Sequence, residues 1–263
     1  MSKNEDMLTF GGHLEVLRKM LFRILALTVG IAAVVFCFKD DTFRLLLAPT
    51  KWNFVTFRGI EQLCALIGWD FRFEEYHVDL IATELSSQFM THLTTSLYLG
   101  VLGASPYIMY ELFRFVSPAL YENERKYSVQ VVVTIYLLFL IGVLMSYYVI
   151  FPISFRFLGT YQVAEAVKST ITLSSYISTF TTLTLLMGLV FQLPIIAFFL
   201  AKMGFLDVEY MKAYRRHAFM LILMVAAIIT PPDVFTQILV TLPLYSLYEV
   251  SIRVVGRVAK KLP

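Results

Sequence analysis

The chain has 263 residues, of which 58% are hydrophobic and only 16% are charged, with a mean hydropathy of +0.72 and a formal net charge of +3. These values exclude an ordinary water-soluble globular domain, whose surface needs more charge. The apolar residues form long runs rather than the spacing of half-buried elements, as lipid-facing helices require. The composition therefore indicates an all-α, polytopic membrane protein.

Six apolar runs predict six transmembrane helices in a single domain covering residues 1–263, because no repeat, flexible linker or low-complexity tract divides the chain. We expect the first run to remain as a helix, since it is too long for a signal-peptide core. We expect the third to end at Pro152, after tyrosines typical of headgroup depth. The runs are Met20–Phe38, Gln88–Phe113, Val129–Phe151, Ile177–Ala201, Ala218–Thr230 and Val234–Ile252.

The distribution of basic residues predicts the orientation. Of the 22 Lys and Arg residues, 15 fall in the N-terminus, the second and fourth loops and the C-terminal tail, and 7 fall in the other loops. By the positive-inside rule, both termini are expected in the cytoplasm. The net positive charge then reflects membrane orientation, and no basic-aromatic pattern indicates nucleic-acid binding.

The first external loop, from about Lys39 to Ser87, is long enough to need structure of its own. Residues 59–68 have a short-helix pattern, and the alternation in Trp69–Phe73 predicts a strand. Cys37 and Cys64 both fall on the external side, where a disulfide is chemically allowed. Two free, mostly buried thiols are the preferred interpretation.

Two interruptions of the apolar runs are expected in the second half. Pro194 removes a backbone hydrogen bond and Gln192 places an amide at mid-membrane depth, which predicts a kink and an inward-facing polar group. The prolines of the motif "TPPD" (230–233) are expected to end the fifth helix, and Asp233 to cap the sixth. Residues 218–230 span roughly 20 Å against a hydrocarbon core of about 30 Å, so the last two helices are interpreted as short. Bilayer thinning, snorkelling, a partner or the rest of the bundle can each meet this mismatch.

The sequence contains no motif typical of catalysis or metal binding, such as His-Glu-x-x-His, Gly-x-Ser-x-Gly or a phosphate-binding loop. We therefore expect a non-enzyme without metal or cofactor. A small-solute secondary transporter stays open as an alternative, because a broken helix with a midplane polar group fits it, although the matching feature in the other half is missing. A membrane scaffold that organises other spans is a third interpretation.

A set of separated motifs resembles the TatC component of the twin-arginine protein translocase over nearly the full length of the chain. The resemblance implies a receptor that binds the twin-arginine signal peptides of folded precursor proteins in the inner membrane. It also implies TatA/TatB-like single-span partners, self-association in a larger complex, and the proton-motive force as energy source. The motifs, in order, are "HLEVLRK" (13–19), "APT" (48–50), "SPYIMYELFRFVSPALYENERK" (105–126), "FQLP" (191–194), "TPPDVFTQ" (230–237) and "PLYSLYE" (243–249).

The resemblance assigns signal-peptide binding to the first cytoplasmic loop. Glu124 matches the family's signal-binding glutamate, and Glu122 can add negative potential. Two carboxylate oxygens can together accept the planar donor fork of an arginine, which a lysine cannot imitate. Without the resemblance, the stretch "ENERK" has the composition of a solvated charge run. The other residues that match the family are Phe115, Pro118, Leu120, Arg125 and, in the N-terminal motif, Arg18.

The N-terminal motif departs from the family pattern. The family usually has a glutamate where this chain has Val16, and the nearest acid, Glu15, lies about 100° away around a helix. Three interpretations stay open. Glu15 reaches the signal peptide from a shifted angle, or Glu111 and Glu122 compensate, or recognition depends on Glu124 alone.

Gln192 stands where many relatives have a glutamate. An amide cannot titrate, so a hydrogen-bonding role is expected there rather than a proton relay. The resemblance also implies contacts with partner helices, because a polar group on a short lipid-facing helix can hydrogen-bond a partner. For Asp233, the helix cap and the partner contact can both hold. The residues expected to contact partner helices are Thr230, Pro231, Asp233, Gln237 and Glu249.

Overall fold

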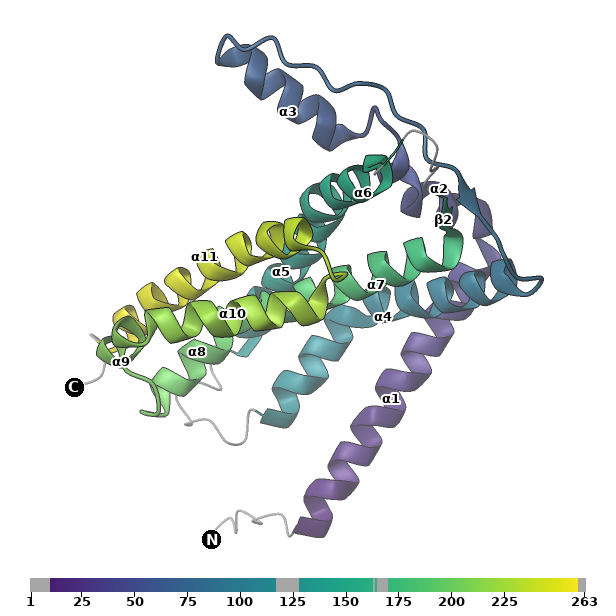
Figure 1. Ribbon diagram of the computed structural model, residues 1–263. Helices are drawn as coiled ribbons and strands as arrows, with labels where there is room; N and C mark the ends of the chain where they lie inside the picture. The colour runs from purple at the N-terminus through teal and green to yellow at the C-terminus, as the bar shows by residue number, and fades with distance from the viewer. Residues whose placement is uncertain (1–9, 117–127, 163, 165–169, 260–263) are drawn as a thin grey trace, which may run out of the picture. The chain divides into compact units, whose positions relative to one another are not determined.

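The computed structural model describes residues 10–116, 128–162, 164 and 170–259, and its regular structure is almost entirely helical (Figure 1). Strands β1 and β2 pair in parallel over only two residues each, so the fold is all-α, as predicted. The elements, in chain order, are α1 (Phe10–Cys37), α2 (Lys39–Leu46), η1 (Ala48–Thr50), α3 (Val55–Leu66), β1 (Leu80–Ile81), α4 (Ser87–Val116), α5 (Ser128–Met145), the π-helical turn η4 (Ser146–Ile150), α6 (Phe151–Thr160), β2 (Ile171–Thr172), α7 (Leu173–Val190), α8 (Leu193–Lys202), α9 (Val208–Ala213), α10 (Arg215–Ile229) and α11 (Val234–Ala259).

Four helical segments of the described chain are long and apolar enough to cross a membrane, and they confirm a polytopic membrane protein. α4 is not among them, and α10 has only 15 residues. The count of six spans and the orientation therefore stay predictions. The four segments are Leu14–Cys37, Val129–Thr160, Leu173–Lys202 and Val234–Val258.

The chain divides into two compact units, one of Met1–Asp40 with His92–Tyr136 and the other of Asp41–Thr91 with Leu137–Pro263. Each unit has its own internal packing, and the single domain stays a prediction.

In the first unit, α1 and α4 pack in antiparallel orientation. The ring of Phe36 stacks on His92 with 4.1 Å between centroids. Eight residues earlier on α1 and eight later on α4, Gly100 lies so close to α1 that a Cβ there would be 2.7 Å from the Thr28 carbonyl oxygen. Small residues allow helices to approach this closely in membranes. Gly100 therefore sets the spacing of this helix pair.

α5 and α6 form one continuous helix through η4, and the predicted helix end at Pro152 is wrong. A proline lacks the N–H that would bond the carbonyl four residues earlier, which here belongs to Tyr148. That carbonyl instead accepts a hydrogen bond from the Thr56 hydroxyl. The π-helical turn lies immediately before the proline, where such turns relieve crowding. The helix therefore runs on to Thr160.

The predicted kink near Pro194 is confirmed. α7 ends at Val190 and α8 begins at Leu193, so the helix is interrupted at Phe191 and Gln192. Pro194 lies in the first turn of α8, where its missing N–H costs nothing.

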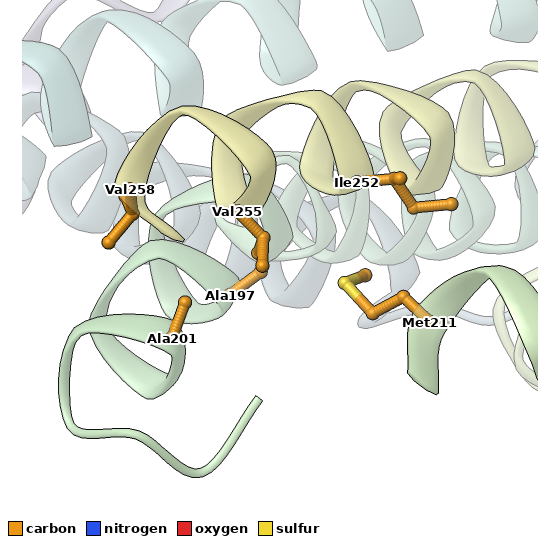
Figure 2. Close-up of a cluster of buried hydrophobic side chains, with 6 residues drawn as sticks. All are labelled: Ala197, Ala201, Met211, Ile252, Val255 and Val258. Carbon is orange, nitrogen blue, oxygen red and sulfur yellow. The ribbon is translucent and has the colours of Figure 1, made fainter. Parts of the chain in front are cut away.

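α11 packs along α8 and α10 (Figure 1). Its 26 residues span about 39 Å at 1.5 Å per residue, so the prediction of a short last helix is wrong. α10, at about 22 Å, is short as predicted. The extra turns of α11 form because their apolar residues are buried against α8 and α9 (Figure 2). This cluster consists of Ala197, Ala201, Met211, Ile252, Val255 and Val258.

The segment between α1 and α4 has its own structure, as predicted, and α3 confirms the short helix expected there. The strand predicted at Trp69–Phe73 is wrong. The Phe73 N–H is bonded by the Glu61 carboxylate at 2.9 Å, rather than by a neighbouring strand, and its ring packs 5.2 Å from that of Phe57. The alternation there reflects packing onto α3.

Cys37 and Cys64 are both free thiols, but the expectation that they are mostly buried is wrong, because Cys37 is exposed and Cys64 is only half-buried.

Arg156 of α6 holds the segment between α3 and α4. Its guanidinium lies over the rings of Phe57, Phe73 and Tyr76 at 5.3, 4.5 and 4.8 Å, and it donates a hydrogen bond to the Glu74 carbonyl at 3.0 Å. Burial raises the pKa of Tyr76 to about 12, although the Arg156 charge opposes this. A cation enclosed by aromatic faces is a favourable contact where water is excluded.

Candidate functional site

The residues predicted to bind a signal peptide fall mainly in the segment after α4. Of the predicted residues between positions 115 and 125, only Phe115 is described, and it is half-buried in the last turn of α4. The others lie outside the described residues. They are Pro118, Leu120, Glu122, Glu124 and Arg125.

Glu15 lies on α1, but it faces away from the side of the helix that packs on α4. It is nine residues from the half-buried Ile24, which corresponds to a rotation of about 180°. Its carboxylate forms an ion pair with Lys19 one turn later, at 2.8 Å, and both side chains are about two-thirds exposed. Arg18 is exposed as well, with its guanidinium 5.7 Å from the centre of the Phe22 ring. Neither side chain is brought to Glu111.

Glu111 is the acidic group that the structure buries in the first unit. Its side chain is 6% exposed, and its Oε1 lies 3.3 Å from Nη1 of Arg23 on α1. The hydroxyl of Tyr107, one turn earlier on α4, donates to the same oxygen at 2.7 Å. A buried carboxylate needs such partners, because an uncompensated charge in a low dielectric is costly.

Sequence reasoning missed the pairing of Arg23 with Glu111. A basic residue inside one apolar run and an acidic residue inside another are a signal for such a pair, because each alone is expensive in a membrane.

The turn between α10 and α11 is built as predicted. α10 ends at Ile229, and the Asp233 carboxylate caps α11 by accepting the Thr236 N–H at 2.6 Å. The other oxygen of Asp233 is buried and accepts no hydrogen bond from the described residues. Thr230 is buried and bonds back to α10 through its hydroxyl, and Gln237 donates to the Leu223 carbonyl at 3.1 Å.

A cavity of about 250 Å³ opens beside this turn, lined in part by Pro231, Thr236 and Ser154. The hydroxyl oxygens of Thr236 and Ser154 are buried and have no hydrogen-bond partner within the described part of the chain. A space of this size holds several water molecules or a polar side chain.

Glu249 lies farther along α11 and is already partnered within the chain. Its carboxylate pairs with Arg215 of α10 at 2.9 Å and receives the Tyr245 hydroxyl at 3.4 Å. This ion pair joins the start of α10 to α11. It gives Glu249 a role in packing as well as any role with a partner.

Gln192 is half-buried at the break between α7 and α8, at the residue preceding α8. The interruption frees backbone groups at the middle of an apolar helix pair, and an amide side chain can satisfy both donors and acceptors there.

Within the described ranges, no three His, Cys, Asp or Glu side chains lie close enough to hold a metal ion.

Comparison with known proteins identifies the family of this chain. The family model described as Sec-independent protein translocase protein (TatC) matches residues 12–243. The chain belongs to the TatC family. It is 32% identical to a TatC of Blattabacterium over 99% of this chain and all of that protein, and 30% identical to Escherichia coli TatC over 91% of this chain and 85% of that protein.

The TatC fold is also found in solved structures. A crystal structure of TatC, described as the twin arginine translocase receptor, matches with a TM-score of 0.74 and 27% identity, covering 94% of this chain and 99% of that one. The TatC family model includes the positions of Glu15, Glu111, Glu124 and Asp233, and it ends before Glu249. This chain is thus a multi-pass membrane subunit of a Sec-independent protein translocase.

Proposed function

We propose that the chain is the signal-peptide receptor and core subunit of a twin-arginine translocase, in the cytoplasmic (inner) membrane with both termini in the cytoplasm. The observation that carries this proposal is the likeness to two solved structures described as twin arginine translocase receptors, over 94% and 91% of this chain. A protein of this kind binds cargo and recruits partners rather than performing bond chemistry, so we expect a non-enzyme.

On this proposal, Glu124 is the first contact of the signal peptide, and it accepts one arginine of the pair through both carboxylate oxygens. Glu122 raises the negative potential nearby, and Phe115 lies on the last turn of α4, which leads into that segment. The apolar part of the signal peptide then inserts along the bundle. Arg18 and Glu15 stay candidates for contacts with the peptide on α1.

Recruitment of TatA/TatB-like single-span partners is proposed for α10 and the start of α11. Met220, Met224 and Ile228 recur every four residues on α10 and are 66%, 67% and 79% exposed, so they form one apolar stripe. Asp233 follows the stripe in the sequence, and its second carboxylate oxygen is buried without a hydrogen-bond partner among the described residues. An apolar stripe with a polar group at its end suits a transmembrane helix that carries a matching donor.

The proposed energy source is the proton-motive force, and Gln192 does not relay the proton, because an amide does not titrate near neutral pH. We propose that Gln192 instead acts as a polar, hydrogen-bonding group at the helix break, where it directly precedes α8.

The test measures export and binding together. A twin-arginine reporter is expressed in cells lacking their own TatC and supplied with this chain, and the purified full chain is titrated with a twin-arginine peptide and its Lys-Lys variant. Glu124→Ala should abolish export and remove the preference for Arg-Arg, whereas Glu209→Ala, an exposed acid on α9, should change neither. Glu15→Ala, measured alongside, shows how much α1 contributes. A solute transporter or a passive scaffold would bind both peptides equally.

A further inference from the structure

The Arg23–Glu111 pair joins α1 and α4, but it lacks the geometry of a strong, permanent ion pair. The two side chains share a single contact, Nη1 to Oε1 at 3.3 Å, whereas strong guanidinium–carboxylate pairs are bidentate and about 2.7–2.9 Å long. Glu111 Oε2 accepts no hydrogen bond from the described residues. Only one of the two Glu111 carboxylate oxygens therefore has a partner among the described residues.

The two partners also differ in how firmly they are held. Glu111 is 6% exposed and is fixed by the Tyr107 hydroxyl, whereas the Arg23 side chain is 53% exposed. The long side chain of a half-exposed arginine can extend toward the headgroups instead. Its departure would leave a buried carboxylate that needs a new cation.

We propose that Glu111 is a second guanidinium-binding residue for the signal peptide, and that Arg23 occupies it in the empty receptor. One arginine of the incoming pair displaces Arg23 and takes both oxygens of Glu111. This inference rests on the proposed function, because it names a second residue of the same binding site.

The spacing of an arginine pair supports two separate carboxylates. Consecutive Cα atoms lie about 3.8 Å apart, and in an extended chain successive side chains point to opposite sides. The two guanidinium groups of an Arg-Arg pair therefore diverge and need acceptors some distance apart. Glu111 lies five residues, or about 8 Å, before α4 ends at Val116, and Glu124 follows in the next segment. A diverging pair therefore needs a second acceptor besides Glu124, and Glu111 is a candidate on α4.

If the peptide displaces Arg23, substitutions of Glu111 and of Arg23 should change peptide binding in opposite directions. Glu111→Gln should weaken binding of the twin-arginine peptide by about tenfold or more, since it replaces a charged acceptor by a neutral one. Arg23→Gln should tighten binding severalfold, because it removes the internal competitor. If the pair only held α1 to α4, both substitutions would weaken binding together.

The experiment titrates the full chain in detergent with four peptides that carry Arg-Arg, Lys-Arg, Arg-Lys and Lys-Lys. Wild type is compared with Glu111→Gln, Arg23→Gln, Arg23→Lys and the control Glu209→Gln. Under the proposal, Glu111→Gln removes the preference for arginine at one of the two peptide positions only, a coupling that a double-mutant cycle isolates. Arg23→Lys keeps a positive charge on α1 and should tighten binding less than Arg23→Gln does, whereas a loss of folding would weaken binding in both variants.

Three outcomes overturn the inference. Glu111→Gln can behave like Glu209→Gln, or it can weaken all four peptides equally, or Arg23→Gln can weaken binding as much as Glu111→Gln does. In each case a wild-type preference for Arg-Arg, lost in Glu124→Ala, leaves the proposed function standing. If wild type does not distinguish Arg-Arg from Lys-Lys, the proposed function fails first, and this inference fails with it.

Discussion

The close approach of α1 and α4 predicts a large penalty for the smallest substitution in the first unit, Gly100→Ala. The new Cβ would lie 2.7 Å from the Thr28 carbonyl oxygen and 2.8 Å from the Ala32 Cβ. Ordinary contact begins near 3.4 Å, so the helices must separate by about 0.7 Å, and a backbone carbonyl cannot rotate away. Overpacking of this kind costs about 1–3 kcal/mol, more than the 0.5–1 kcal/mol that alanine gains over glycine in a helix.

Gly30→Ala on α1 is the matched control, because nothing lies within 4 Å of its added Cβ. We expect Gly100→Ala to lower the apparent Tm in detergent by several degrees and Gly30→Ala to leave it unchanged or raise it slightly. Equal Tm values for the two variants would show that α1 and α4 do not pack at this distance, and would refute the reasoning.

Three further predictions concern the second unit. Asp233→Ala should cost about 1 kcal/mol of stability by loss of the α11 cap, whereas Asp233→Ser should keep the cap and the Tm. If the carboxylate also contacts a partner, the Ser variant will no longer co-purify with single-span subunits. If co-purification persists, capping α11 is the whole role of Asp233. Arg156→Met should speed limited proteolysis within residues 67–79, since contacts with three rings and the bond to the Glu74 carbonyl are lost at about 1–2 kcal/mol, while the exposed Arg58→Met should not. Gln192→Asn should retain more export of a twin-arginine reporter than Gln192→Leu, and full export by the Leu variant would exclude a hydrogen-bonding role.

The helices follow from apolar runs, but their ends depend on distant residues. The run from Val129 and the tyrosines before Pro152 gave the third helix its predicted end. The end was wrong because a hydroxyl about a hundred positions earlier, on Thr56, bonds the carbonyl that the proline leaves open. The length of α11 was wrong for a similar reason, since Val255 and Val258 continue the helix by burial against α8. Neither contact has a local signal.

In the candidate site, too, some features follow from the local sequence and others depend on distant residues. The resemblance singled out Glu124, and the local chemistry of a "TPPD" turn was enough to predict the cap by Asp233. The pairing of Arg23 with Glu111 spans 88 positions and depends on the antiparallel register of α1 and α4. Charges inside apolar runs indicate that a partner exists, but only the register identifies it.

Helical geometry relates the absence of the family glutamate at Val16 to the pairing of Arg23 with Glu111. Val16 is seven residues from Arg23, the α1 residue that contacts Glu111, and so lies about 20° from it around the helix, whereas Glu15 is about 80° away. A glutamate at position 16 would thus lie near the edge that faces α4, and the shift to position 15 removes negative charge from that edge. On our proposal Glu111 supplies the missing charge from α4, on the same side of the helix pair. A chain with the family glutamate restored by Val16→Glu should then bind twin-arginine peptides even when Glu111 is replaced by Gln, and failure of this rescue would show that the two positions do not serve one site.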